Sequence, residues 1–146
     1  MILLLTLGLA SAILPDNTFE EVIDIAAAHG LSCVEVMCWP KGKALRRYAG
    51  VTHIDVGTLT KEKAAYYRDY AAQRGVEISA LAYYPNPMDA DLEKRDFYTR
   101  HLYRVIDAAA LMQVNRVTTF IGRDTTKCPE ENIALMLELW PPIVQY

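Results

Sequence analysis

Apolar and polar positions along the chain alternate between two periods, one typical of buried strands and one of amphipathic helices. Residues 1–15 carry no charge, and 2–14 are nearly all apolar. This run favours a buried parallel strand, which is covered on both faces. A secretory signal peptide is the alternative, but no basic residue precedes Lys41, and the run is shorter than the roughly 18 residues of a membrane span. The rest of the pattern predicts strands over 31–37, 76–82 and 116–121 and helices over 19–29, 60–74, 92–112 and 130–140.

The predicted helix ends repeat along the chain. Thr18 and Glu21 form a capping box at the first helix start, and Gly30 and Gly75 terminate the first two helices. Gln113 occupies the same helix-to-strand corner after the third helix, but glutamine lacks the freedom of glycine at positive φ, so we expect a strained or differently built corner there. Strand–helix units of roughly 40 residues indicate a parallel sheet. Pro141 and Pro142 are expected to interrupt the last helix, with a possible restart there.

Composition indicates one folded domain. The chain has 146 residues, 52% hydrophobic and 23% charged, which is enough to bury a core without disulfide or zinc support. The net charge of −3 argues against a nucleic-acid binder. Three cysteines without a CxxC pair indicate neither a disulfide framework nor a zinc cluster, and they predict a reducing, cytoplasmic compartment.

The ends of the predicted strands carry the resemblance to a known family. The segments are Val34–Pro40 (VEVMCWP), Gly50–Val56 (GVTHIDV), Ala82–Pro87 (AYYPNP) and Thr118–Arg123 (TTFIGR). In this order, and along essentially the whole chain, the sequence resembles the sugar phosphate isomerase/epimerase family with the xylose-isomerase-like TIM barrel. The resemblance implies an α/β fold, a parallel (βα)4 half of a TIM (β/α)8 barrel. It implies one domain over residues 1–146, truncated after the fourth βα unit.

The same resemblance bears on cofactors. Full-length relatives hold a divalent metal ion (Mn, Mg, Co or Zn) through Glu, Asp, His and Glu at the ends of strands five to eight. The chain is predicted to contain only the first four strand–helix units, so these ligand positions are absent from it. We therefore expect no tight metal binding by this chain and assign neither metal ligands nor catalytic residues. The three histidines form no HxxxH pair.

Candidate substrate-binding residues lie where barrel strands end, since reactive groups gather at that rim. Glu35 is a candidate acceptor for substrate hydroxyls, or else the partner of a basic group inside the barrel. Trp39 and Tyr84, and less so Tyr83, offer aromatic faces to a sugar, or else plug the barrel mouth. Asn86 between two prolines is a rigidly placed polar group or a turn former.

Further candidates come from the loops. His53, near Asp55, is a candidate for binding a substrate phosphate or hydroxyl or for proton transfer, or else is structural. Phe120 and Arg123 follow the last strand, and Arg123 either clamps an anionic group or pairs with Asp124. His29 suits the end of a helix, and His101 is expected on a helix surface. A local cluster of basic residues is a candidate for steering a phosphorylated sugar, or else it is a solvated loop. The cluster comprises Lys41, Lys43, Arg46 and Arg47.

The leading hypothesis is a sugar (phosphate) isomerase/epimerase-type chain that supplies pocket walls and is inactive alone. Its expected partner is a small-molecule sugar or sugar phosphate, with no nucleic acid and no membrane. The alternative is a non-catalytic half-barrel module that forms a homo-oligomer through exposed strand edges. A third hypothesis is a flavodoxin-like sheet that binds an anion, but the sequence has no phosphate-binding glycine loop of the GxGxxG or GxxxxGK(S/T) type. A DNA-repair role like that of endonuclease IV lacks metal ligands and a basic groove.

Overall fold

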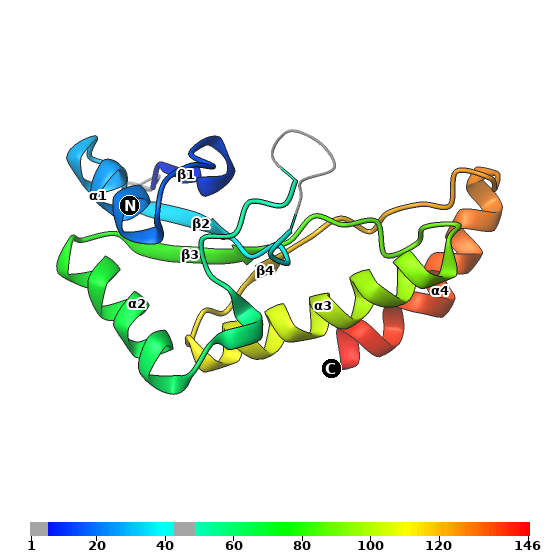
Figure 1. Ribbon diagram of the computed structural model, residues 1–146. Helices are drawn as coiled ribbons and strands as arrows, with labels where there is room; N and C mark the ends of the chain where they lie inside the picture. The colour runs from blue at the N-terminus through cyan, green and yellow to red at the C-terminus, as the bar shows by residue number, and fades with distance from the viewer. Residues whose placement is uncertain (1–5, 43–48) are drawn as a thin grey trace, which may run out of the picture.

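The four strands form one parallel sheet in sequential order, and each strand is followed by a helix. The computed structural model describes residues 6–42 and 49–146, and Figure 1 shows α2, α3 and α4 along one side of the strands. The sheet order is β1-β2-β3-β4, which confirms the α/β, half-barrel prediction. The elements are β1 (Gly8–Ala10), η1 (Ser11–Ile13), α1 (Phe19–Ala28), β2 (Cys33–Met37), η2 (Val56–Thr58), α2 (Lys61–Gln73), β3 (Glu77–Ala82), α3 (Leu92–Leu111), β4 (Val117–Thr118) and α4 (Pro129–Gln145).

The two faces of the sheet are covered unequally. Val34 and Val36 of β2 and Leu81 of β3 are fully buried in the main core, together with apolar side chains of α1, α2 and α3. Because side chains alternate along a strand, Glu35 and Met37 face the other way. On that face a much smaller cluster forms around Met37, Val51 and Ala82. The helices therefore cover one face, and the face that lines the interior of a full barrel is the open one.

The first strand is shorter than the predicted run over 2–14. Residues 1–5 lie outside the described part, β1 spans Gly8–Ala10, and the chain then turns into η1. Ser11 is buried there, and its hydroxyl accepts a hydrogen bond from the Met37 N–H (2.9 Å). The prediction of burial on both faces was wrong, because β1 is an edge strand: Leu7 is 70% exposed and Ile13 59%.

The last unit also differs from its prediction. β4 is two residues long instead of the predicted 116–121, because within the described residues it pairs with β3 alone. The prolines Pro141 and Pro142 were expected to interrupt the last helix, but α4 continues through them to Gln145. Tertiary contacts hold this end: Ile143 is buried, and the Tyr146 hydroxyl donates to Asp107 on α3 (2.8 Å).

The three helix-to-strand corners have the same hydrogen bonds. The amides of Leu31, Val76 and Val114 donate to carbonyls five residues earlier, at 2.9, 3.0 and 2.9 Å, which is the Schellman pattern. The residue before each amide has a positive φ: 70° at Gly30, 68° at Gly75 and 56° at Gln113. Gln113 is the single non-glycine residue with positive φ in the described part of the chain, which confirms the prediction of a strained third corner. The Thr18–Glu21 capping box is also present.

His101 does not lie on the surface of α3, as the sequence predicted. It is buried, its ring packs edge-on against Tyr83 at 4.6 Å, and its Nε2 lies 2.8 Å from the Cys38 carbonyl at the end of β2. Burial lowers its pKa from the usual 6.5, an effect opposed by that hydrogen bond. The position of His101 in the helical pattern did not reveal its burial, because apolar residues and polar residues are closely interspersed around α3.

Replacing Gln113 with glycine should stabilise the fold by about 0.5–1 kcal/mol, because glycine relieves the left-handed strain at this corner. Chemical denaturation followed by circular dichroism measures the change. The matched reverse variant is Gly75→Gln, where a Cβ meets nothing within 4 Å, and it should lose about 1 kcal/mol from backbone strain alone. Equal stability of all three proteins would contradict the strain at these corners.

Acid should weaken the fold through His101. Because its folded pKa lies below 6.5, the unfolded chain binds more protons as the pH falls through 6.5, so the free energy of unfolding decreases toward lower pH. His101→Gln, whose amide can still donate to the Cys38 carbonyl, should make this pH dependence shallower. His29→Gln, at an exposed histidine, is the matched control. An unchanged slope in His101→Gln would show that this side chain does not contribute to acid sensitivity.

Candidate functional site at the carboxyl ends of the strands

Polar and aromatic side chains converge on the open face where β2, β3 and β4 end. The register pairs Met37 with Ala82 and Ala82 with Thr118, so the residues around these positions lie side by side. Parallel strands direct all their carboxyl ends to one edge. Glu35, Tyr84 and Thr118 meet there on the face that the helices leave open.

Glu35 is the centre of this group. Its Oε1 accepts two hydrogen bonds, from the Tyr84 hydroxyl (2.7 Å) and from the Thr118 hydroxyl (2.5 Å). Its Oε2 has no hydrogen-bond partner within the described residues. Burial raises the pKa of Tyr84, and so does its bond to the Glu35 carboxylate, which keeps the phenol protonated as a donor. The carboxylate is therefore held in one orientation with one oxygen uncommitted.

Thr118 was not among the residues singled out from the sequence. The available signal was its position two residues before Phe120, since residues i and i+2 of a strand share a face. A threonine in a short strand carries no chemistry on its own, and only the pairing of β3 with β4 reveals its contact with Glu35.

Aromatic rings border the carboxylate. The Tyr84 ring lies 4.7 Å from the Phe120 ring at an angle of 45°, and Phe120 is 52% exposed. Trp39 and Tyr84 both pack against the Met37–Val51–Ala82 cluster. The structure thus places Glu35, Tyr84 and Phe120 around the same part of the open face, while Trp39 packs against both the small cluster and the main core.

Tyr83 points the other way. It is fully buried on the helix-covered face, packs edge-on against Trp39 at 4.9 Å, and burial raises its pKa. Its hydroxyl and the Trp39 Nε1 are both buried without a hydrogen-bond partner within the described residues. This agrees with the weaker sequence argument for Tyr83 as a sugar contact.

His53 is held between the end of β2 and the loop after β1, since its amide donates to the Met37 carbonyl (3.0 Å). It is buried, its Nε2 lies 3.1 Å from the Leu14 carbonyl, and burial lowers its pKa. Asp55 next to it caps η2 through the Gly57 amide and pairs with Lys41 (3.2 Å). The other members of the predicted basic cluster, Lys43, Arg46 and Arg47, lie outside the described residues. Lys41 is engaged with Asp55, and His53 neighbours the loop after β1.

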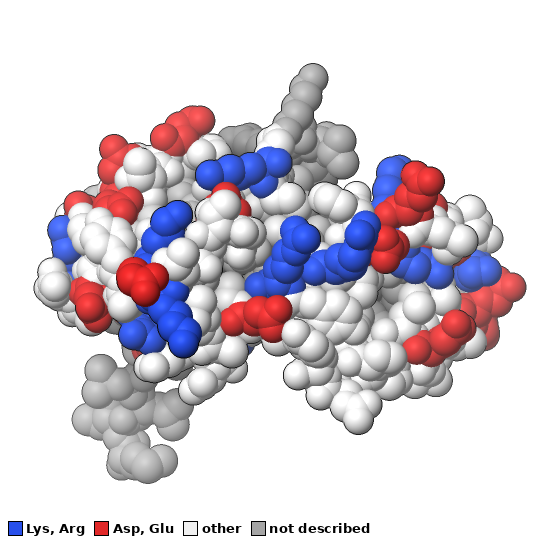
Figure 2. All heavy atoms as spheres, turned by 60° about the horizontal axis from the view of Figure 1, so that its bottom comes forward, with Lys and Arg blue, Asp and Glu red and all other residues white. Residues whose placement is uncertain are grey.

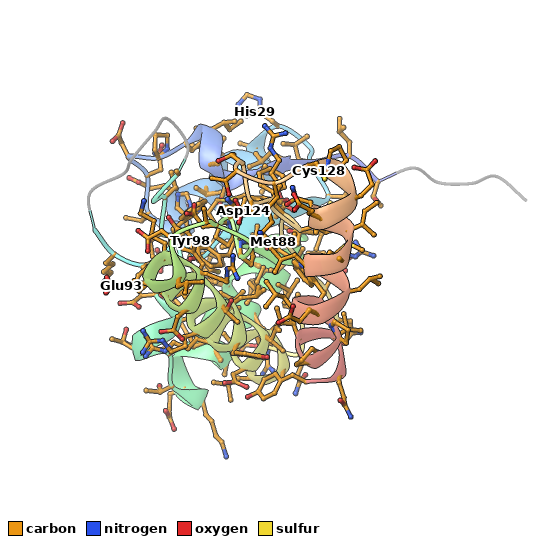
Figure 3. The ribbon with its side chains drawn as sticks, turned by 90° about the vertical axis from the view of Figure 1, so that its right-hand side faces the viewer. His29, Met88, Glu93, Tyr98, Asp124 and Cys128 are labelled. Carbon is orange, nitrogen blue, oxygen red and sulfur yellow. The ribbon has the colours of Figure 1, made fainter. Side chains whose placement is uncertain are left out.

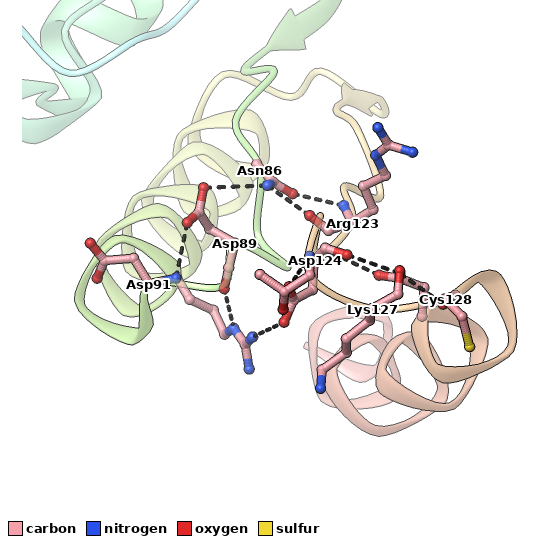
Figure 4. Close-up of polar contacts among 10 residues, drawn as sticks. Asn86, Asp89, Asp91, Arg123, Asp124, Lys127 and Cys128 are labelled. Atoms are coloured by element: carbon pink, nitrogen blue, oxygen red, sulfur yellow. Dashed lines mark hydrogen bonds and ion pairs between the residues drawn. The ribbon is translucent and has the colours of Figure 1, made fainter.

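Asn86 ties the loop after β3 to the loop after β4 (Figure 4). Its Oδ1 accepts from the Arg123 amide (2.8 Å), and its Nδ2 donates to the Arg123 carbonyl (2.9 Å). Gly122 has φ 83°, and a Cβ there would collide with the Asn86 amide. The structure therefore uses Asn86 to hold the backbone that follows Phe120, while the Arg123 side chain is exposed.

A second polar network lies below this contact. Asp124 is buried between α3 and α4 (Figure 3) and accepts from the Thr126 hydroxyl and amide, which hold its pKa below the usual range. Arg95 of α3 lies 4.0 Å from the Asp124 carboxylate and donates to the Asp89 carbonyl (3.0 Å). The carboxylate of Asp124 thus pairs with Arg95, not with Arg123. His29, by contrast, is exposed at the end of α1, on the periphery (Figure 3).

The described residues show neither a concentrated basic surface nor a metal-binding cluster. Basic and acidic side chains are interspersed over the face shown in Figure 2. Within residues 6–42 and 49–146, no three His, Cys, Asp or Glu side chains gather closely enough to hold a metal ion, so these residues do not fit a metal centre, and we derive no step through one. The helices in the same ranges are too short or too polar to cross a bilayer.

The fold has counterparts among solved structures. A putative xylose isomerase from Rhodospirillum rubrum has a TM-score of 0.67 and 18% identity, with 97% of this chain and 50% of that chain covered. A probable 3-DHS dehydratase, AsbF, from Bacillus anthracis has a TM-score of 0.63 and 14% identity, with 92% and 45% covered. The chain therefore spans about half the length of these structures, and at such identities they show the fold alone.

Among proteins with curated functions, none matches the chain. Residues 23–146 match the family described as the xylose isomerase-like TIM barrel. This match takes in every unit of the fold except β1 and the start of α1, and it agrees with the four parallel strand–helix units of the structure. The chain belongs to the xylose isomerase-like TIM barrel family.

Proposed function

We propose that this chain supplies one wall of a pocket for a sugar or sugar phosphate, in a protein of the isomerase/epimerase type. The observation that carries the proposal is the Glu35 carboxylate, oriented through Oε1 by Tyr84 and Thr118. Its uncommitted Oε2 suits a substrate hydroxyl, because a charged acceptor strengthens such a hydrogen bond. The neighbouring ring pair of Tyr84 and Phe120 offers an apolar surface to the C–H face of a sugar.

The roles of the other predicted residues follow from their contacts. Trp39 extends the aromatic wall, Asn86 acts by positioning the loop that carries Phe120, and the exposed Arg123 is available to an anionic substituent of the ligand. His53, buried against Leu14, acts through the loop after β1 and does not touch the ligand. A cytoplasmic location stays a prediction, supported by the free thiols of Cys33, Cys38 and Cys128.

Catalysis of isomerisation is a separate question from sugar binding. Metal-dependent isomerisation needs a group that polarises a carbonyl, and the described residues offer no cluster for a metal ion. We therefore infer that this chain by itself binds sugars without turning them over. An assay with Mn, Mg, Co or Zn against ketoses and their phosphates checks this inference.

Glu35→Gln should weaken the binding of ketose phosphates about tenfold, because the amide keeps the shape but loses the charge that strengthens the hydrogen bond. Titration calorimetry on the purified chain measures the dissociation constant. Glu138→Gln, at an exposed glutamate on α4, is the matched control and should bind as the unmodified chain does. If Glu35→Gln and the control bind equally well, Glu35 is a structural residue, and the proposed pocket is wrong.

A second candidate function is self-association, favoured by apolar groups at both edges of the sheet. Leu7 and Ile13 flank β1, Ile121 follows β4 at 52% exposure, and Leu137 on α4 is 64% exposed. Open strand edges with apolar neighbours tend to pair with another chain. Two copies in which β4 of each meets β1 of the other would close eight parallel strands around a shared interior.

Leu137→Glu should shift such a dimer to monomer, because a charge on the exposed face of α4 opposes its burial. Leu92→Glu is the matched control, since Leu92 is equally exposed (68%) at the start of α3. Sedimentation velocity over a range of concentrations measures the mass. A soluble monomer at every concentration in the unmodified chain would exclude this function while leaving the sugar pocket untouched.

A further inference from the structure

The strained corner at Gln113 borders a cavity at the opposite end of the strands from Glu35. The cavity measures about 400 Å³ and lies where β3 and β4 begin. β4 joins β3 only from the Leu81–Val117 pair onward, so the first residues of β3 lie beside residues 113–116 without strand pairing. This late joining opens the space.

The cavity has an apolar floor and a polar rim. Val76, Ile78 and Met112 lie in its wall and are buried. Six polar residues are also among those that line the cavity, two of them partly buried and four exposed: Arg68, Ser79, Glu77, Gln113, Asn115 and Arg116. Within the described residues, none of these six side chains makes a hydrogen bond or an ion pair. The contrast with the other end is sharp, since Asn86, Arg95 and Asp124 there are all bonded to protein groups.

The charges on the rim favour an anion. Two arginines and one glutamate are among the residues that line the cavity, and arginine binds phosphate and carboxylate groups bidentately. Glutamine and asparagine amides add donors and acceptors at the same rim. An apolar floor with a few converging polar groups is the usual construction of a small-molecule site.

Gln113 adds an independent observation. The corresponding corners use glycine at φ 70° and 68°, whereas this corner holds a glutamine side chain at φ 56°. Left-handed backbone at a non-glycine residue persists where the surroundings enforce it, and such strain clusters at ligand sites. Gln113 is also one of the residues that line the cavity, so the strained backbone lies at its edge.

We propose that this cavity binds a small organic anion, whose phosphate or carboxylate group is held by Arg68 and Arg116. Its hydrogen-bonding groups meet Gln113 and Asn115, and its apolar part lies against Ala72 and Val114. This cavity is separate from the Glu35 pocket, so anion binding here does not depend on the sugar-binding function.

Titrations of the isotopically labelled chain with inorganic phosphate and, separately, with malonate test the proposal by NMR. Backbone shifts should move at residues 76–79 and 113–116 in at least one titration, and which anion binds more tightly identifies the group. Arg68→Gln and Arg116→Gln should each weaken binding about tenfold. Arg100→Gln, at an exposed arginine paired with Asp96 (2.8 Å), is the matched control and should bind normally.

Gln113→Gly separates a ligand role from a structural one. It should weaken anion binding even though it stabilises the fold, a combination that a merely structural glutamine would not produce. Shifts that are scattered over the surface, or equal affinities in Arg68→Gln, Arg116→Gln and Arg100→Gln, would overturn the site. Unchanged affinity in Gln113→Gly would remove Gln113 from it.

Discussion

Parallel strand pairing is the constraint on which the rest of this structure depends. Each parallel strand needs a crossover helix to reach the next, and the crossover returns the chain to the same end of the sheet. Three crossovers on the same side bury Val34, Val36 and Leu81 under the helices. They also send every loop after a strand to one edge and every corner after a helix to the other. The molecule thus has two structurally distinct ends before any particular side chain is considered.

The two ends use their polar groups differently. At the carboxyl ends, most polar side chains bond to one another or to backbone: Asn86 holds Arg123, Thr126 holds Asp124, and Tyr84 and Thr118 hold Glu35. This network fixes loop geometry and leaves the Glu35 Oε2 without a protein partner within the described residues. At the amino ends, the six polar side chains at the cavity rim make no hydrogen bond or ion pair to protein groups within the described residues. The proposed sugar pocket therefore rests on an oriented carboxylate, and the proposed anion site rests on two arginines beside a left-handed residue.

Predictions from the sequence were least accurate at the two outer strands and at the last helix. The outer strands β1 and β4 are the shortest, and each has a neighbour on one side only. An apolar run such as 2–14 is typical of a strand buried on both faces, but an edge position requires less regular structure. In α4 the opposite occurs, because docking of Ile143 and Tyr146 on the rest of the molecule carries a helix through two prolines that local rules would place at its end.

Local chemistry was sufficient for the boundaries of the first three helices, the order of strands and helices, and the strained corner. The Thr18–Glu21 capping box, the glycine corners and Gln113 depend on groups a few residues apart, so the sequence alone determined them. It also placed Glu35, Tyr84 and Phe120 near strand ends. Tertiary structure alone decided that Thr118 orients Glu35, that His101 bonds to Cys38, and that Asn86 grips Arg123. Those contacts join residues 37 to 83 positions apart, and their geometry comes from strand register and helix packing, which no short segment encodes.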